Sequence, residues 1–151
     1  MTTIAYDHKN KMIACDSRLL SGDDIIMSDT AIKMIEKNGV FFWWSGGRSD
    51  GEKLIDAYLS GASKSNLDAS MFVWDGEKLC LCGTSSEGEL YIDSVEYNNA
   101  LGSGRKLALA AMDLGKTARE AVEYAKTRDP YSGGDVHVYS LHDLKNEATF
   151  E

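Results

Sequence analysis

The order of apolar and polar residues predicts a chain that begins with strands. A polar turn at residues 7–10 separates the first two, and SGG ends a continuous apolar run, VFFWW. Such a run is typical of a strand that is covered on both faces. The expected strands of the first half are Thr2–Tyr6, Lys11–Cys15, Asp24–Met27, Ala31–Ile35 and Val40–Trp44.

A helix is expected next, followed by more strands. Ser49 and Glu52 have the spacing of a capping box, and Gly61 is a typical helix end. The apolar stripe between them is formed by Leu54, Ile55, Tyr58 and Leu59. The pattern then predicts strands at Met71–Trp74, Lys78–Cys82 and Glu89–Ile92, the first two joined by the hairpin turn DGEK.

The last third is predicted to be helical before a return strand. Two patterns, Arg105–Leu114 and Ala118–Arg128, are separated by Gly115, and Thr117 with Glu120 repeats the capping box. Alanines on the inner face of both helices allow close approach to a sheet. Pro130 and the glycines of YSGGD end the second helix, and DVHVYSL reads as a strand. We expect one α+β domain over residues 1–151.

Charge and hydropathy exclude several classes of protein. The formal net charge is −8 and the pI about 4.8, which argues against a nucleic-acid surface. No apolar run is long enough to span a bilayer, and no basic segment followed by an apolar one opens the chain. We therefore expect a cytoplasmic protein that binds neither nucleic acid nor membrane.

The cysteines and histidines do not predict a metal or cofactor site. Cys15, Cys80 and Cys82 make an odd count, which favours a reducing compartment. Cys80 and Cys82 are one residue apart, unlike a zinc pair, and no second Cys/His pair with ligand spacing accompanies them. Packing is the better interpretation of these thiols.

The first residues raise a question of chemistry. A chain-terminal threonine supplies both a hydroxyl nucleophile and a base, because its own α-amine has a pKa of about 7.7–8.0. Removal of Met1 would place Thr2 at the chain end. If Met1 is retained, an amide replaces the amine and the mechanism fails.

Six segments in order resemble the proteasome β-type peptidases, most closely the HslV-type threonine peptidase. They are TTIAYD, IACDSR, IKMI, SGGRSDGEKL, ALGSG and DPYSGGDVHVYS, and they run over nearly the whole chain. The resemblance implies an N-terminal-nucleophile hydrolase fold, a four-layer αββα sandwich of two antiparallel sheets with helices outside.

The same resemblance implies roles for seven residues. Thr2 matches the nucleophile, Asp16 the acid beside it, and Lys33 the lysine that lowers the proton affinity of the hydroxyl. Gly47 matches the glycine whose N–H forms the oxyanion hole. The outer polar residues that orient the amine and a water match Ser103, Asp129 and Ser132.

Each residue also has a plainer interpretation. Thr2 fits the start of a strand, and Asp16 fits a turn. Strand alternation places Lys33 between Ala31 and Ile35 on an inward face, where it needs an anion such as Asp16; a lysine that reaches out to solvent is the alternative. The glycines of SGG and GSG fit turns, and the residues of DPYSGG fit a helix end.

The chain departs from the family pattern at residues 62–70, which are too few for the second helix usual there. One helical layer is therefore expected to be thinner, which weakens the case for stacked rings. The loop SRLLSGDDIIMSD brings three aspartates towards the expected cleft. Ser45 and Ser49, which flank the oxyanion glycine, predict a modest, polar specificity pocket.

The leading prediction is a threonine-type endopeptidase, active once Met1 is removed. The resemblance implies a peptide or unfolded-protein substrate, a homo-oligomer that can be a ring, and a possible ATP-dependent unfoldase as partner. Two alternatives stay open: a proteasome-like scaffold that assembles without cleaving, and an amidase for a small molecule.

Overall fold

A computed structural model describes residues 2–63 and 65–148, in which strands and helices alternate in blocks. The strands are β1 (Thr3–Asp7), β2 (Met12–Cys15), β3 (Leu19–Leu20), β4 (Ile26–Ser28), β5 (Met34–Lys37), β6 (Val40–Gly46), β7 (Ala69–Trp74), β8 (Leu79–Thr84), β9 (Leu90–Ser94), β10 (Asn99–Gly102) and β11 (His137–Ser140). The helices are α1 (Arg48–Ser60), α2 (Arg105–Asp113), α3 (Ala118–Arg128) and α4 (Leu141–Ala148).

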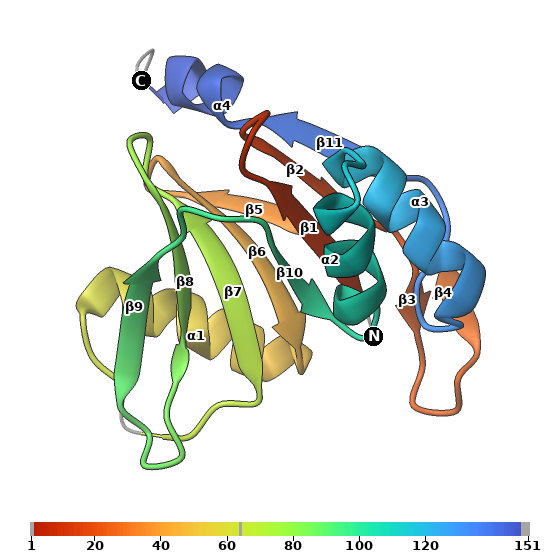
Figure 1. Ribbon diagram of the computed structural model, residues 1–151. Helices are drawn as coiled ribbons and strands as arrows, with labels where there is room; N and C mark the ends of the chain where they lie inside the picture. The colour runs from red at the N-terminus through yellow and green to blue at the C-terminus, as the bar shows by residue number, and fades with distance from the viewer. Residues whose placement is uncertain (1, 64, 149–151) are drawn as a thin grey trace.

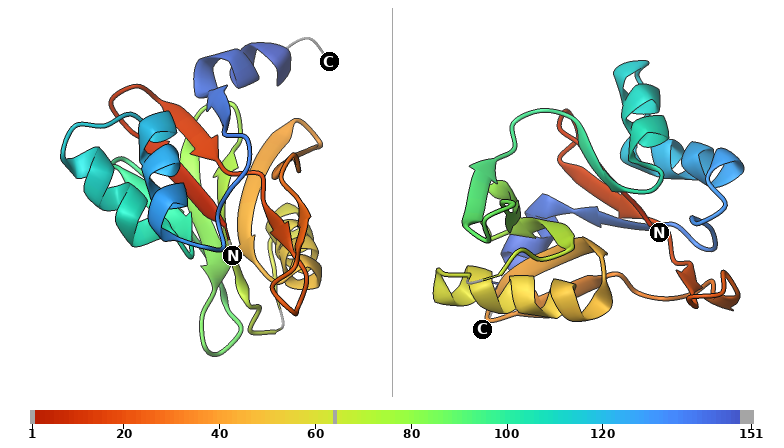
Figure 2. Two further views of the ribbon diagram at one scale, coloured as in Figure 1. Left: turned by 90° about the vertical axis from the view of Figure 1, so that its right-hand side faces the viewer. Right: turned by 90° about the horizontal axis from the view of Figure 1, so that it is seen from below.

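The strands form two antiparallel sheets and a small hairpin (Figure 1). One sheet has the order β10-β1-β2-β11, and the other is a five-stranded meander from β5 to β9. The hairpin β3–β4 projects from the end of the molecule at which β1 begins (Figures 1 and 2). The DGEK turn joins β7 to β8 as predicted, because Trp74 pairs with Leu79.

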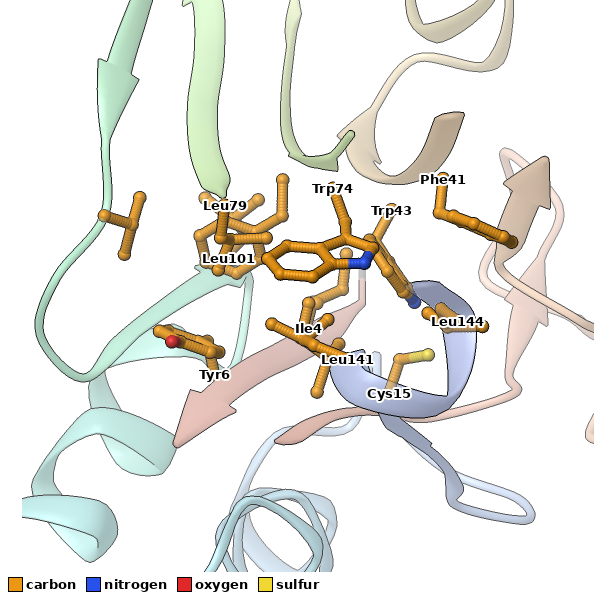
Figure 3. Packing of buried hydrophobic residues seen from close by; sticks show 13 residues of the cluster. Ile4, Tyr6, Cys15, Phe41, Trp43, Trp74, Leu79, Leu101, Leu141 and Leu144 are labelled. Carbon is orange, nitrogen blue, oxygen red and sulfur yellow. The ribbon is translucent and has the colours of Figure 1, made fainter. Parts of the chain in front are cut away.

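The main core lies between the two sheets (Figure 3). Alternation places Ile4 and Tyr6 of β1 on the face that meets Trp43 and Trp74 of the other sheet. Leu141 of α4 enters the same cluster. Fully burying each of these large side chains contributes on the order of 1.5–3 kcal/mol, so this layer fixes how the sheets face each other.

Helices cover the outer faces of both sheets. Alanines of α2 and α3 pack on Ala5 and Ala14 of the four-stranded sheet, as the alanine-rich faces predicted. Leu54 and Ile55 of α1 pack on Phe42 and neighbouring side chains of the five-stranded sheet. The strand Val40–Trp44 is therefore covered on both faces, as expected. Within the described residues, α1 is the only helix on the outer face of this second sheet, whereas Leu141 and Leu144 of α4 lie in the cluster on its inner face.

The caps of α1 and α3 differ. Thr117 accepts a hydrogen bond from the Glu120 N–H and Glu120 returns one, so this capping box is confirmed. The predicted box at Ser49 is wrong, because α1 begins at Arg48 and its N-cap is Gly47, without a side-chain cap. The turn from β6 continues directly into the helix, which leaves Ser49 inside it.

Three elements were not predicted, and one was misplaced. The two-residue strand β3, the strand β10 in NNALG, and α4 after the last strand have short or ambiguous patterns. The strand expected at Ala31–Ile35 begins at Met34 instead. Lys33 therefore lies just before β5, and strand alternation is not the reason for its inward direction.

Candidate active site

Thr2 directly precedes β1, at the end of this strand that lies nearest the hairpin β3–β4 (Figures 1 and 2). Its strand, β1, is held between β10 and β2, and the register Ile4↔Cys15 brings the end of β2 beside the start of β1. Asp16, the residue after β2, continues this pairing through its N–H, which donates to the Thr3 carbonyl at 3.2 Å. The fold therefore places the Asp16 carboxylate next to Thr2.

Asp16 is fully buried, and donors surround its carboxylate. Its Oδ1 accepts hydrogen bonds from the Thr2 hydroxyl at 2.8 Å and from the Thr3 N–H at 3.0 Å. Its Oδ2 accepts from the Gly133 N–H at 3.0 Å and from the Arg18 N–H at 3.3 Å. These donors offset the cost of removing a carboxylate from water. Asp16 is therefore a buried, hydrogen-bonded carboxylate, unlike an exposed acid in a turn.

Lys33 completes the group around the Thr2 hydroxyl. Its Nζ lies 2.5 Å from Thr2 Oγ1 and 2.9 Å from Asp16 Oδ1, and 10% of its side chain is exposed. The alternative of a solvent-directed lysine is therefore wrong for this structure. A cation in contact with the hydroxyl oxygen favours the alkoxide that attack requires.

A second polar group lies on the nitrogen side of Thr2. The Thr2 N–H donates to Ser103 Oγ at 3.2 Å, and Ser103 Oγ donates to Asp129 Oδ2 at 2.6 Å. Ser132 Oγ donates to the same oxygen at 2.7 Å and lies 2.6 Å from Thr3 Oγ1. The structure thus brings Ser103 together with Asp129 and Ser132, which belong to a later segment of the chain.

These contacts set the pKa of the Asp129 carboxyl. Burial alone would raise the pKa of its carboxyl, but the hydrogen bonds donated by Ser103, Ser132 and the Tyr131 N–H hold that pKa below its usual value. Asp129 is therefore a carboxylate at neutral pH, and its negative charge lies one side chain away from the Thr2 nitrogen. A carboxylate in this place favours the protonated form of an amine at that nitrogen.

Gly47 does not offer its N–H to the cleft. This N–H donates to the Asp68 carbonyl at 2.9 Å, which extends the pairing of β6 with β7. In an antiparallel ladder this bond makes Gly46↔Ala69 the non-hydrogen-bonded pair, so the Gly46 N–H points away from β7. It points to the side of β6 on which β5 and Lys33 lie. The oxyanion role predicted for Gly47 is corrected accordingly. The N–H that is not engaged by β7 belongs to Gly46, the preceding residue.

Glycines at two places are required by close approach. Gly46 has φ +123°, and a side chain there would overlap the Asp68 carbonyl. Gly102 has φ +96°, and a side chain there would overlap the backbone of Thr2. The glycines of SGG and GSG therefore do more than make turns: Gly46 lets β6 approach the backbone at the start of β7, and Gly102 lets β10 approach Thr2.

A cleft of about 1310 Å³ opens in front of Thr2. Thr2, Lys33, Ser45, Gly46 and Ser103 all line it, whereas Ser49 does not. Most of the remaining wall is apolar, formed by Leu19, Leu20, Met27, Ile32, Trp44, Leu67, Leu81, Leu101 and Leu109. The pocket predicted to be modest and polar is instead large and mixed.

Sequence reasoning missed several residues that complete the site. Thr3 is fully buried and joins the Asp16 and Ser132 groups, while Gly133 supplies a backbone donor to Asp16. The repeated threonine at the chain start and the double glycine after Ser132 were the available signals. Among residues 2–63 and 65–148, no three His, Cys, Asp or Glu side chains gather in a way that would hold a metal ion.

Met1, whose removal the N-terminal-threonine mechanism requires, lies outside the described residues. In the part of the chain that is described, no helix has the length and apolarity needed to cross a membrane.

The comparisons with known proteins support the fold. No family profile and no curated protein matches the chain by sequence. Among solved structures, eukaryotic HslV from Trypanosoma brucei is similar, with a TM-score of 0.69 and 20% identity. The match covers 91% of this chain and 98% of that one. At this identity the likeness shows the fold alone: the chain has an HslV-like, proteasome-like fold of mixed α/β type with antiparallel sheets.

Proposed function

We propose that the chain, once Met1 is removed, is a threonine-type peptidase of the proteasome β and HslV kind with the four-layer αββα arrangement of N-terminal-nucleophile hydrolases. The observation that carries this proposal is the position of Thr2 Oγ1, which lies 2.8 Å from Asp16 Oδ1 and 2.5 Å from Lys33 Nζ. A strand that merely starts with threonine has no need of a buried ion pair around its hydroxyl.

The first half-reaction transfers the acyl group to Thr2. Thr2 Oγ1 attacks the scissile carbonyl carbon, and its proton passes to the freed Thr2 amine. The amine then gives a proton to the leaving nitrogen as the C–N bond breaks, which leaves an ester on Thr2. Lys33 stabilises negative charge on Oγ1, and Asp16 holds both groups in place.

The second half-reaction hydrolyses that ester. A water attacks the ester carbonyl, the amine accepts one of its protons, and Thr2 Oγ1 leaves and is reprotonated. Ser103 lies against the Thr2 nitrogen and is oriented in turn by Asp129. In the proposal this group holds the amine, and Ser132 holds the other side of Asp129.

The oxyanion of each tetrahedral intermediate needs an N–H donor. We assign this role to Gly46, because the N–H of Gly47 is engaged by the Asp68 carbonyl. Removing one oxyanion donor costs about 10²–10³ in kcat in other hydrolases, so the assignment has a measurable consequence.

The proposal includes a peptide or unfolded protein as substrate and a homo-oligomer, with a ring and an ATP-dependent unfoldase as further possibilities to test. The volume of the cleft beside Thr2, about 1310 Å³, exceeds the roughly 300–1,000 Å³ of typical small-molecule sites, which favours a peptide as substrate. A ring would hide this cleft in a chamber, so mass in solution tests the assembly directly.

The test of the proposal is turnover of fluorogenic peptides by the wild type, Thr2→Ser and Thr2→Ala. The expected result is activity in the wild type, reduced activity in Thr2→Ser, and none in Thr2→Ala although its circular dichroism is unchanged. Hydrolysis at the wild-type rate by Thr2→Ala would overturn the proposal. Mature protein that retains Met1 and turns over no peptide would favour the non-catalytic scaffold instead.

A further inference from the structure

The cleft in front of Thr2 differs in charge from the rest of the molecule. The chain as a whole has 24 acidic and 16 basic residues. Among the described residues that line the cleft, five are basic and one is acidic. These are Arg18, Lys33, Arg48, Arg105 and Lys106, with Asp68 as the acid.

Two of the five cations are already neutralised. Arg18 Nε lies 2.9 Å from Asp29, and Lys33 is paired with Asp16. The loop at residues 17–29 was expected from the sequence to bring three aspartates near the cleft, and none of the three lines it. Asp29 is used by Arg18, while Asp23 and Asp24 do not line the cleft.

The other three cations are uncompensated. Within the described part of the chain, no carboxylate oxygen lies within 4.0 Å of the charged groups of Arg48, Arg105 or Lys106. All three are exposed residues that line the same cleft as Thr2. Together they outnumber Asp68 and the nearby Asp129 carboxylate, so the unpaired charge around the nucleophile is positive although the chain carries −8.

The positions of these cations are unfavourable for the helices that carry them. Arg48 begins α1, and Arg105 and Lys106 begin α2. A helix N-terminus carries partial positive charge and is stabilised by acidic side chains, so basic residues in a first turn are slightly destabilising. The first turn of α2 has no acidic residue and no side-chain cap. Helix stability therefore does not explain why these residues are basic.

We propose that the cleft selects peptides with carboxylate side chains, Asp or Glu, next to the scissile bond. This inference rests on the proposed peptidase function and names its substrate class. The three free cations attract the carboxylate, while the apolar wall, which includes Trp44 and Leu101, contacts its methylene groups and the neighbouring residues. The lining is thus amphipathic in the way that an acidic peptide requires.

Binding is tested first, apart from catalysis. Thr2→Ala binds two fluorescent peptides that are identical except for Glu or Gln at the residue on the acyl side of the scissile bond. Attraction to uncompensated cations at contact distance predicts about tenfold tighter binding of the Glu peptide at low salt. The preference should shrink in 1 M salt, where the Debye length falls to about 3 Å. Equal affinities at low salt would overturn the inference.

Variants then identify the responsible residues. The triple variant Arg48→Gln/Arg105→Gln/Lys106→Gln should lose most of the preference, to within about twofold, because it removes the unpaired charges. Lys116→Gln is the control: it removes the same kind of charge from an exposed position outside the cleft and should retain the full preference. A triple variant that discriminates as well as the wild type would contradict the assignment to these cations.

Turnover by the wild type separates the two proposals. A kcat/KM about tenfold higher for the Glu peptide than for the Gln peptide supports both the peptidase and its selectivity. Equal turnover of the two peptides contradicts the selectivity alone. If no peptide is cleaved, the peptidase proposal fails, and the binding preference of Thr2→Ala still decides whether the cleft recognises carboxylates.

Discussion

Replacing Lys33 by methionine should destabilise the fold as well as stop catalysis. The side chain is 10% exposed and its partner Asp16 is not exposed at all, so the ion pair is buried. The substitution keeps the apolar stem and removes the charge. Asp16 then remains as a buried carboxylate whose compensating cation is missing.

The size of the effect follows from what Asp16 keeps. Loss of one partner from a buried ion pair typically costs about 3–5 kcal/mol. Four other donors still reach the Asp16 carboxylate, from Thr2, Thr3, Arg18 and Gly133. We therefore expect the lower end, about 3 kcal/mol. With a urea m-value of about 2 kcal/mol/M, the unfolding midpoint should fall by about 1.5 M.

Urea unfolding followed by tryptophan fluorescence measures this change, since Trp43 and Trp74 lie in the core between the sheets. Lys37→Met is the matched control: its ion pair with Asp56 is exposed, and its loss should leave the midpoint nearly unchanged. Equal midpoints for Lys33→Met and the wild type would mean that the Asp16 carboxylate is stable in the core without its cation, and would contradict the prediction.

Three further predictions concern other parts of the structure. Gly46→Ala should destabilise the fold more than Gly39→Ala and abolish turnover. Both glycines have positive φ, but only at Gly46 would the added Cβ overlap a backbone carbonyl, that of Asp68. Equal unfolding midpoints for the two variants would contradict this. Asp129 has a lowered pKa, so it stabilises the fold above about pH 4 and this contribution is lost as the pH falls through its folded value. The unfolding free energy of Asp129→Asn should thus fall less than that of the wild type between about pH 5 and pH 3. Parallel plots of unfolding free energy against pH would contradict a stabilising role of the Asp129 carboxylate. Burial raises the pKa of Cys15 and Cys82 to about 12, so a thiol reagent at pH 8 should label them only in urea; rapid labelling of the native chain would contradict their burial.

The sequence predicted the elements whose patterns are long and regular. The apolar run at residues 40–44 and the two alanine-faced helices have strong periodicity, and the structure has β6, α2 and α3 there. The elements it missed are short or locally ambiguous. The strand β10 contains an asparagine and a glycine, which favour turns, and it forms because β1 pairs with it.

The candidate site was predictable as a set of residues but not as a geometry. Motif order was enough to group Thr2, Asp16 and Lys33, and the structure places them within hydrogen-bonding distance. The choice between Gly46 and Gly47 depends on which N–H the β6–β7 register uses, and this register cannot be read from SGG alone. The positive charge of the cleft could not be predicted from the sequence either. Its unpaired cations come from the first residues of α1 and α2, which are far apart in the chain.

The most direct test of the central claim is the intact mass of the purified protein before and after reaction with an electrophile directed at N-terminal threonine. The expected result is a chain that lacks one methionine and gains a single adduct, mapped to Thr2 and absent from Thr2→Ala. A chain that retains Met1 and forms no adduct at Thr2 would contradict it.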